Sequence, residues 1–237
     1  MMESFDKAAR QYDKFGHIQR DMAAWLAEWI PANRSGRALE IAAGTGFFTR
    51  HLVPWNGPFS ATDASHAMLL AGHANHPGIP WKLCTADALP PEEMDWIFSS
   101  SFLQWADDPA ALFAHWRSRL HRKGRILAGL FAEPTLSELR ELAPKMTPLT
   151  WRTGSVWKQA LDDAGLCCLR LEEETRAYHF PSGMDLLRAL HRVGAAPRRQ
   201  LNPVRLRELI REYDSRFAVE NGVLSTWTFL RLEAVAG

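Results

Sequence analysis

The sequence of 237 residues lacks the features of several large classes of protein. Its three cysteines, Cys84, Cys167 and Cys168, are odd in number and lack zinc-finger spacing, which excludes a disulfide framework. No apolar run approaches the roughly 20 residues of a membrane span, and the N-terminus shows no signal-peptide pattern. The formal charge of +1 predicts no general attraction to nucleic acid. We therefore expect a cytoplasmic protein with reduced thiols that binds neither nucleic acid nor membrane. We also expect a monomer, although none of these features determines the oligomeric state.

Two kinds of catalytic site are also missing. His66, His73 and His76 come close to helical spacing, but no carboxylate or cysteine partners complete a metal site, so we expect no metal. No Gly-x-Ser-x-Gly turn is present, and Ser99-Ser100-Ser101 is typical of a strand end rather than of a hydrolase nucleophile.

The first half of the sequence alternates between helix and strand patterns. Apolar residues at helical spacing between residues 5 and 30, broken at Gly16, predict two helices ahead of the first strand. Strands are predicted at 37–43, 58–63, 81–86, 94–100 and 124–131. Helices are predicted between them at 46–53, 66–75 and 108–121, the last with Asp108 as N-cap and Pro109 at its first position. This alternation predicts an α/β fold with a parallel sheet covered by helices on both faces.

After residue 132 the pattern changes. Helices are predicted at 135–146, 155–164, 183–194 and 203–217, and strands at 167–175 and 224–230. The last two strands are thus separated by a long helical segment. We expect a single domain over 1–237, in which residues 1–35 form lid helices and 36–132 the cofactor-binding core. The remainder, 133–237, would complete the sheet and carry a helical insertion at about 180–220.

The segment from Glu40 to Phe47 is the strongest local signal. An apolar run ends in an acid, and the closely spaced Gly44 and Gly46 follow, which lets the backbone approach a ligand closely. Asp63 ends the next apolar run, where an acidic side chain can accept hydrogen bonds from both ribose hydroxyls of an adenosine cofactor. The glycine segment and Asp63 together therefore predict an adenosine-containing ligand.

Two further acids distinguish between adenosine cofactors. The glycine segment nearly matches the dinucleotide fingerprint, but Thr49 stands at its last position. Glu40 would repel a pyrophosphate and favour a cationic amino group. Asp87, after the third strand, is placed to accept a hydrogen bond from an adenine amino group. S-adenosylmethionine (SAM) fits these three acids better than NAD does.

Residues 37–130 resemble the class I SAM-dependent methyltransferases. The motifs that carry this resemblance are Glu40-x-x-x-Gly44-x-Gly46, Thr62-Asp63-x-Ser65 with Met68, Asp87-Ala88-Leu89-Pro90 and Asp95-Trp96-Ile97-Phe98-Ser99. More narrowly, the chain is similar to the malonyl-acyl-carrier-protein O-methyltransferases of biotin synthesis, the BioC family. This narrower resemblance rests on Phe5-Asp6-Lys7-Ala8-Ala9 with Tyr12 and Gln19-Arg20, Leu103-Gln104-Trp105, Leu136-Ser137-Glu138-Leu139, and Leu186-Leu187-Arg188-Ala189-Leu190 with Gly194-Ala195.

The resemblance implies a Rossmann-like, mostly parallel sheet with an antiparallel last strand. It also implies a cofactor site for SAM and its product S-adenosylhomocysteine (SAH), and the expected cofactor-binding residues are Tyr12, Gln19, Glu40, Ala42, Gly44, Gly46, Asp63, Ala64, Met68, Asp87, Ala88 and Ser99. Three positions depart from the family. Ala42 replaces the usual first glycine, Ala43 stands where cysteine is common, and Ser100 stands where asparagine is frequent.

The implied reaction is methylation of the free carboxylate of a malonyl thioester on acyl carrier protein. A carboxylate is already ionised at neutral pH, so no general base is required. Gln104 and Trp105 are expected to border the substrate. Arg188 and Arg192, in a segment with seven arginines from 185 to 211, are expected to meet the substrate carboxylate or the acidic carrier.

Three alternatives remain open at this point. The chain is a class I methyltransferase for another small acid, an NAD-dependent oxidoreductase, or a non-catalytic protein of the same fold that binds a carrier.

Overall fold

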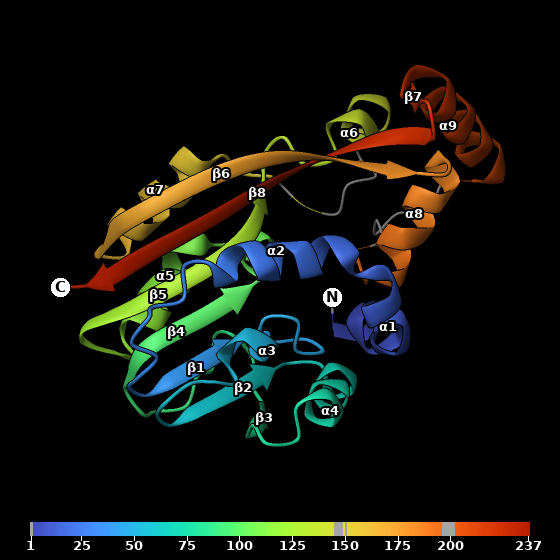
Figure 1. Cartoon of the computed structure of the whole chain (residues 1–237). Helices are drawn as coiled ribbons and strands as arrows, with labels where there is room; N and C mark the ends of the chain where they lie inside the picture. Colours follow the sequence, from blue (N-terminus) through green and yellow to red (C-terminus); the bar gives the residue numbers. More distant parts are fainter. Residues whose placement is uncertain (1, 145–148, 150, 196–201) are drawn as a thin grey trace.

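A computed structural model describes residues 2–144, 149, 151–195 and 202–237. It contains an eight-stranded sheet in the order β3-β2-β1-β4-β5-β8-β6, with β7 paired to β8 (Figure 1). The strands are β1 (Ala38–Ile41), β2 (Phe59–Asp63), β3 (Trp81–Leu83), β4 (Met94–Ser100), β5 (Leu120–Ala132), β6 (Leu166–Phe180), β7 (Ala218–Val219) and β8 (Gly222–Ala236). The first five pair in parallel, whereas β8 runs antiparallel to both β5 and β6. The expected mostly parallel sheet with an antiparallel last strand is confirmed.

Helices cover both faces of the sheet, as expected. They are α1 (Met2–Phe15), α2 (His17–Ala27), α3 (Thr49–Leu52), α4 (His66–Asn75), the 3-10 helix η1 (Leu103–Trp105), α5 (Pro109–Arg117), α6 (Ser137–Leu142), α7 (Gly154–Asp163), α8 (Gly183–Arg192) and α9 (Pro203–Arg216). Trp116 of α5 and Trp157 of α7 are buried in the core of one face, whereas Leu26 of α2 and Leu52 of α3 are buried against the other. None of the helices in the described ranges is long and apolar enough to cross a bilayer.

Several element boundaries differ from the sequence prediction for local reasons. The helix predicted at 108–121 ends at Arg117, because Leu120 already pairs with Met94 in the sheet. Its start is as predicted, since the Asp108 carboxylate accepts a hydrogen bond of 3.0 Å from the N–H of Ala111. The helix predicted at 46–53 begins only at Thr49, because Gly46 has a φ of +95° that a helix does not allow.

The last strands are longer than predicted. β6 and β8 form an antiparallel ribbon from Leu166 paired with Ala236 to Phe180 paired with Val223. The strands predicted from the sequence, 167–175 and 224–230, cover only part of this ribbon. β6 carries charged residues on its exposed side, which concealed its alternating pattern. The helices α8 and α9 lie between these two strands in the sequence, as expected for the insertion.

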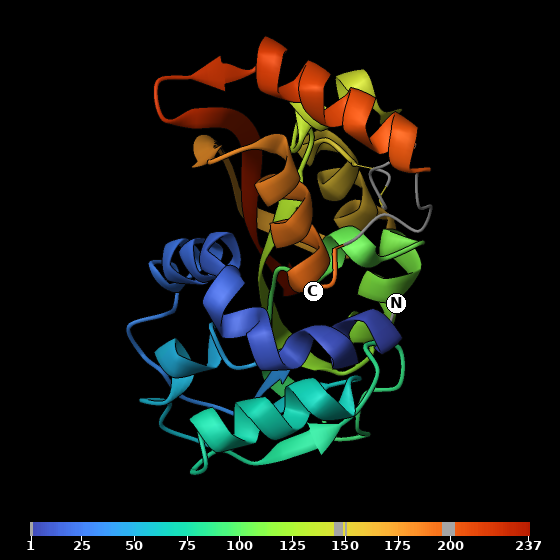
Figure 2. The same cartoon turned by 90° about the vertical axis from the view of Figure 1, so that its right-hand side faces the viewer.

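α1 and α8 lie beyond the carboxyl ends of the parallel strands (Figure 1). Seen from that side, α1 crosses in front of the strand ends, between α4 and α8 (Figure 2). In doubly wound sheets ligands bind at this edge, outside the carboxyl ends of the strands. The fold therefore places the N-terminal helix over the expected binding edge.

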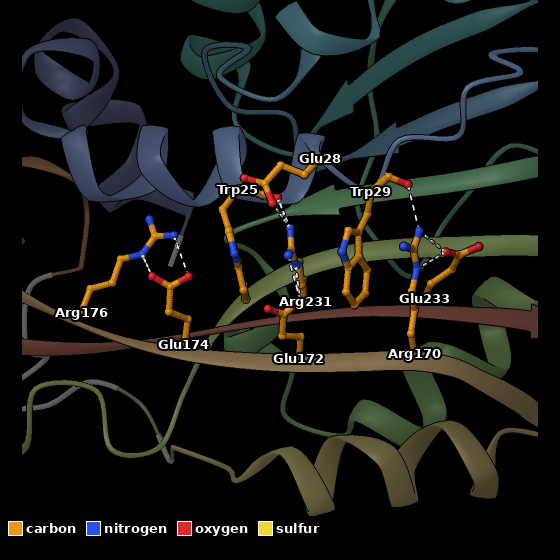
Figure 3. A network of polar contacts seen from close by, with 9 residues as sticks. All are labelled: Trp25, Glu28, Trp29, Arg170, Glu172, Glu174, Arg176, Arg231 and Glu233. Atoms are coloured by element: carbon orange, nitrogen blue, oxygen red, sulfur yellow. Dashed lines mark hydrogen bonds and ion pairs between the residues drawn. The ribbon is translucent and has the colours of Figure 1, made fainter.

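α2 is fixed to the sheet by a stack of three arginines and two tryptophans (Figure 3). The Arg231 guanidinium lies between Trp25 and Trp29, 4.1 and 4.5 Å from the two ring centres. The guanidinium of Arg170 covers the other face of Trp29, 4.0 Å from the ring centre. The guanidinium of Arg176 lies 5.6 Å from the ring centre of Trp25. Alternating cations and indole rings attract one another through the quadrupole of the rings. The stack thus joins a helix near the N-terminus to β6 and β8.

Carboxylates neutralise this stack. Arg231, only 5% exposed, forms ion pairs of 2.8 Å with Glu28, which directly follows α2, and with Glu172 of β6. Arg170 forms an ion pair of 2.6 Å with Glu233, which is also buried. A buried guanidinium with paired carboxylates avoids the cost of an isolated buried charge. These contacts therefore hold α2 against β6 and β8, and with it the end of α1, which adjoins α2 at Gly16.

Candidate active site

The turn after β1 has an unusual backbone. Ala42, Gly44 and Gly46 all have positive φ, of 55°, 59° and 95°. A Cβ at Gly46 would collide with the ring of His76, whereas a Cβ at Gly44 would meet nothing within 4 Å. Gly46 is therefore required by packing, and Gly44 faces open space beside the strand ends. Ala42 adopts the left-handed conformation that the expected glycine would accept without strain.

Glu40, at the end of β1, is a buried carboxylate that faces the site. One oxygen accepts a hydrogen bond of 2.7 Å from the Thr49 hydroxyl, and the other has no partner among the described residues. Burial, together with the nearby charge of Asp63, raises the pKa of Glu40 to about 8. An arriving ammonium group would supply the missing partner and favour the ionised form.

Asp63, at the end of β2, holds the turn in place. Its two carboxylate oxygens each accept a hydrogen bond of 2.8 Å, one from the N–H of Gly44 and one from the N–H of Ser65. Burial raises the pKa of Asp63, and the backbone hydrogen bonds oppose this effect. The acid expected to bind ribose is thus already oriented by two backbone donors.

α1 is tied to the same loops through two aspartates that the sequence analysis did not assign. Asp13 accepts a hydrogen bond from the Thr45 hydroxyl and another, of 3.1 Å, from the Asn75 amide. Asp6 accepts a hydrogen bond from the Ser65 hydroxyl. Asp6 and Asp13 lie seven positions apart, which places them on one side of a helix, and this spacing was the available signal.

These elements enclose a cavity with an empty volume of about 850 Å³, its open mouth included. This is in the usual range for sites that bind small molecules. The cavity is lined by nine of the expected site residues, namely Tyr12, Gln19, Glu40, Ala42, Gly44, Asp63, Ala64, Met68 and Trp105. Burial raises the pKa of the Tyr12 phenol beyond its usual range, so this residue is a neutral hydrogen-bonding group.

Four expected cofactor residues lie outside the lining of this cavity. Gly46 packs under His76. Ser99 is fully buried, and its hydroxyl donates to the carbonyl of Ile41, so it joins β4 to β1. Asp87 and Ala88 are exposed, while the neighbouring Ala86 lines the cavity. The assignment of Asp87 to adenine stays a prediction.

A second, smaller cavity of about 450 Å³ adjoins the first. Its walls are largely apolar and include Phe131, Trp151, Leu190 and Trp227. The two cavities share five residues, which we call the shared wall: Phe5, Tyr12, Gln19, Ser101 and Trp105. Gln104 lines only the second cavity.

The expected arginines lie elsewhere. Arg188 is exposed and pairs with Asp185 at 3.4 Å. Arg192 lies 4.1 Å from the ring of Phe15 at the end of α1, and neither arginine lines the two cavities. Arg198 and Arg199, in the same arginine-rich segment, lie outside the described residues.

The first cavity fits an adenosine that carries an amino acid. The unpartnered oxygen of Glu40 suits an ammonium group, the open face of Gly44 admits close backbone contact, and Asp63 is oriented at the next strand end. A dinucleotide would place a negatively charged pyrophosphate beside Glu40, which would raise the pKa of this carboxyl further and would give neither group a cationic partner.

Comparison with known proteins agrees with this reading. Residues 39–128 match the family described as a methyltransferase domain. The solved structure of YcgJ from Bacillus subtilis superposes with a TM-score of 0.68 and 14% identity, covering 91% of this chain and 98% of that one. Magnesium protoporphyrin IX methyltransferase from Synechocystis, solved with bound SAH, superposes with a TM-score of 0.59 and 14% identity, covering 92% and 83% of the two chains. The chain thus has the class I methyltransferase fold, and residues 39–128 carry a methyltransferase domain, as expected.

The named relatives of the chain indicate a narrower group of methyltransferases. The chain is similar to the bifunctional biotin biosynthesis protein BioHC of Cellvibrio japonicus, with 32% identity over 81% of this chain and 40% of the relative. It is also similar to malonyl-[acyl-carrier protein] O-methyltransferase 2 of Ilyobacter polytropus, with 29% identity over 81% of this chain and 78% of the relative. The resemblance to malonyl-acyl-carrier-protein O-methyltransferases noted in the sequence is confirmed. The chain spans less than half of the bifunctional relatives that it matches.

Proposed function

We propose that this protein transfers the methyl group of SAM to the free carboxylate of malonyl-acyl carrier protein, forming the methyl ester and SAH in an early step of biotin synthesis. The observation that carries the proposal is the pair of joined cavities. The first cavity, whose lining includes Glu40, Gly44 and Asp63, fits the cofactor, and the smaller apolar cavity beyond the shared wall fits an acyl thioester arm. The similarity to named malonyl-carrier methyltransferases supports the choice of substrate.

The residues of the first cavity would hold the cofactor at three points. Glu40 would bind the ammonium group, the backbone around Gly44 would contact the amino-acid portion, and Asp63 would bind the ribose. When bound, SAM supplies a methyl group made electrophilic by its positively charged sulfur. No residue has to remove a proton, because the substrate carboxyl, with a pKa of about 3 to 4, is already ionised.

The contribution of the protein is therefore alignment and exclusion of water. The shared wall would hold the carboxylate against the methyl group, and apolar side chains such as Phe5 and Trp105 would remove water from it. We propose that α1 acts as a lid. Its aspartates bond to the cofactor loops, and the backbone breaks at Gly16 where α1 meets the anchored α2.

The exposed arginines of α8 and α9 would dock the carrier. Acyl carrier proteins are acidic, and their prosthetic arm carries a phosphate. α8 contributes Leu190 to the second cavity, so a carrier bound on its outer side would lie near the entrance for the arm. We further propose a cytoplasmic monomer; the free thiols of Cys84, Cys167 and Cys168 agree with a reducing compartment.

Methyl transfer from radiolabelled SAM tests the proposal. We expect base-labile label on malonyl-carrier and none on acetyl-carrier, which lacks the carboxylate. Malonyl-CoA and simple dicarboxylates serve as competing acceptors. Label on a small dicarboxylate but not on the carrier would show that the substrate is a different acid. Binding of NADH in place of SAM would overturn the assignment of SAM as cofactor.

A further inference from the structure

Ser101 is the residue of the shared wall that follows a strand of the sheet directly. It comes immediately after β4, whereas Phe5, Tyr12 and Gln19 belong to α1 and α2. If the cofactor fills the first cavity and the acyl arm fills the second, the reacting atoms meet at this wall. Side chains that are fixed to the sheet at this point are best placed to orient the substrate.

The hydroxyls of Ser100 and Ser101 are buried and have no hydrogen-bond partner in the described part of the chain. Both residues line the first cavity, and Ser101 lines the second as well. Buried polar groups in native proteins are nearly always paired, and an exception calls for an explanation. The preceding Ser99 shows the usual arrangement, because its hydroxyl donates to the carbonyl of Ile41.

The backbone of Ser101 is fixed in a strained conformation. Its φ of +60° lies in the left-handed region. Its N–H donates a hydrogen bond of 2.8 Å to the carbonyl of Gly129. Its carbonyl accepts a hydrogen bond of 2.7 Å from the side-chain amide of Gln104. The backbone groups are thus satisfied while the side chain is not. Backbone strain that the surroundings hold in place is frequent at functional sites.

The donors at the wall are neutral. Among residues with described positions, neither cavity is lined by arginine, lysine or histidine. A bidentate arginine would engage both oxygens of a carboxylate. Hydroxyl donors can bind one oxygen and leave the lone pair of the other free to attack.

We propose that the hydroxyls of Ser100 and Ser101 bind one oxygen of the substrate carboxylate and direct the other toward the methyl group. This assignment rests on the proposed function. The free oxygen forms the new bond to the methyl carbon, the bond between that carbon and sulfur breaks, and its electron pair stays on sulfur, which becomes neutral. No proton is transferred, so the serines act by position and not as acids or bases.

Binding of the acyl carriers to the SAH-loaded protein tests the serine assignment without turnover. The dissociation constants of malonyl-carrier and acetyl-carrier are measured by calorimetry for the wild type, Ser100→Ala and Ser101→Gly. Glycine removes the hydroxyl and tolerates the positive φ, so Ser101→Gly is expected to fold as well as the wild type or better. We expect each variant to bind malonyl-carrier about 10-fold more weakly or worse, with acetyl-carrier and SAH unchanged.

Two control variants match these changes away from the site. Lys123→Gly relieves a similar φ of +66° near the start of β5, at the end of that strand far from the cavities. Ser118→Ala removes the hydroxyl of an exposed serine. Both are expected to bind like the wild type. Equal weakening of malonyl- and acetyl-carrier by the site variants, or no weakening, would overturn the serine assignment alone. A wild type that binds SAH but does not prefer malonyl- to acetyl-carrier would overturn the proposed function and this assignment with it.

Discussion

The backbone N–H of Gly44 donates a hydrogen bond of 2.8 Å to the carboxylate of Asp63, 19 positions further along the chain. The glycine turn and the acid of the second strand are therefore one structural unit. The other oxygen of Asp63 accepts from the N–H of Ser65, which precedes α4. A single carboxylate thus connects the ends of two strands and the start of a helix at the cofactor cavity.

Asp63→Asn should weaken both stability and cofactor binding. An asparagine offers one acceptor oxygen, so one of the two backbone donors would face the amide NH2 of the new side chain. We expect the free energy of unfolding to fall by about 1–3 kcal/mol and the SAH dissociation constant to rise by about 10-fold or more. Urea denaturation and calorimetry measure the two effects. Asp162→Asn, an exposed change on α7, is the control and should alter neither.

Three of the expected cofactor residues that line the first cavity share one property. Glu40, Gly44 and Asp63 follow directly from strand ends, whose positions the alternating pattern predicts well. Ser99 is also at a strand end, but the burial of its side chain depends on the neighbouring strand β1. Successive side chains of a strand point to opposite faces, so Ser100 lines the cavity and Ser99 does not. Ser101 lies beyond the end of β4, where its φ of +60° departs from the extended conformation, so the alternation does not apply to it.

Contacts between distant segments were not predictable from the sequence. The stack of Arg231 between Trp25 and Trp29 joins residues about 200 positions apart, and no local pattern signals it. Likewise, the arginine count near α8 suggested a carboxylate clamp, but the apolar side of that helix, through Leu190, is what lines the second cavity. Helical periodicity alone does not show which side of a helix faces a ligand.

Ala42→Gly should stabilise the protein. Ala42 has a φ of +55°, a conformation that costs an L-residue roughly 1–2 kcal/mol and costs glycine little. Part of this gain is lost to the greater flexibility of glycine in the unfolded chain, so we expect a net gain of about 0.5–1 kcal/mol. Thermal denaturation should show a Tm higher by roughly 2 °C, with SAH affinity equal or better. A lower Tm would show instead that the methyl group of Ala42 contributes more through packing than its backbone costs.

Arg231→Ala should destabilise the protein by about 2–4 kcal/mol, because it removes two ring contacts and two ion pairs from a buried position. Arg231→Lys keeps the charge but not the planar group, so its loss should be intermediate. Urea denaturation of both variants is the measurement. Arg205→Ala, which removes an exposed pair with Glu208, should change stability by less than about 0.5 kcal/mol. If Arg205→Ala and Arg231→Ala cost the same, the stack does not fix α2.

Arg188→Ala and Arg192→Ala should raise the Michaelis constant for malonyl-carrier far more than that for SAM. Both side chains are exposed on α8, so their loss removes attraction to an acidic carrier without opening the cofactor cavity. We expect a rise of about 3- to 10-fold that shrinks at high salt. Arg122→Ala, in the first part of β5, is the matched control. Equal effects on carrier and SAM would contradict docking on α8.

Glu40 should make stability depend on pH. Burial raises its pKa from the ordinary 4.5 to about 8 in the folded protein. The folded state then holds the proton more tightly than the unfolded state does. The contribution of Glu40 to the free energy of unfolding is therefore fully present below pH 4.5 and falls as the pH rises toward 8. The slope in that window is at most about 1.4 kcal/mol per pH unit. Urea denaturation between pH 6 and 8.5 should show a steeper decline for the wild type than for Glu40→Gln, which cannot ionise.

Cofactor binding should show the opposite dependence. A bound ammonium group favours ionised Glu40, so binding releases a proton and the affinity for SAH rises between pH 6 and 8, by up to about 10-fold per unit. Calorimetry in two buffers of different ionisation enthalpy counts the released proton directly. Glu40→Gln should bind SAH more weakly and release no proton from this site. If the wild type and Glu40→Gln release equal numbers of protons, Glu40 is already ionised in the free protein, and its unpartnered oxygen is not the ammonium site.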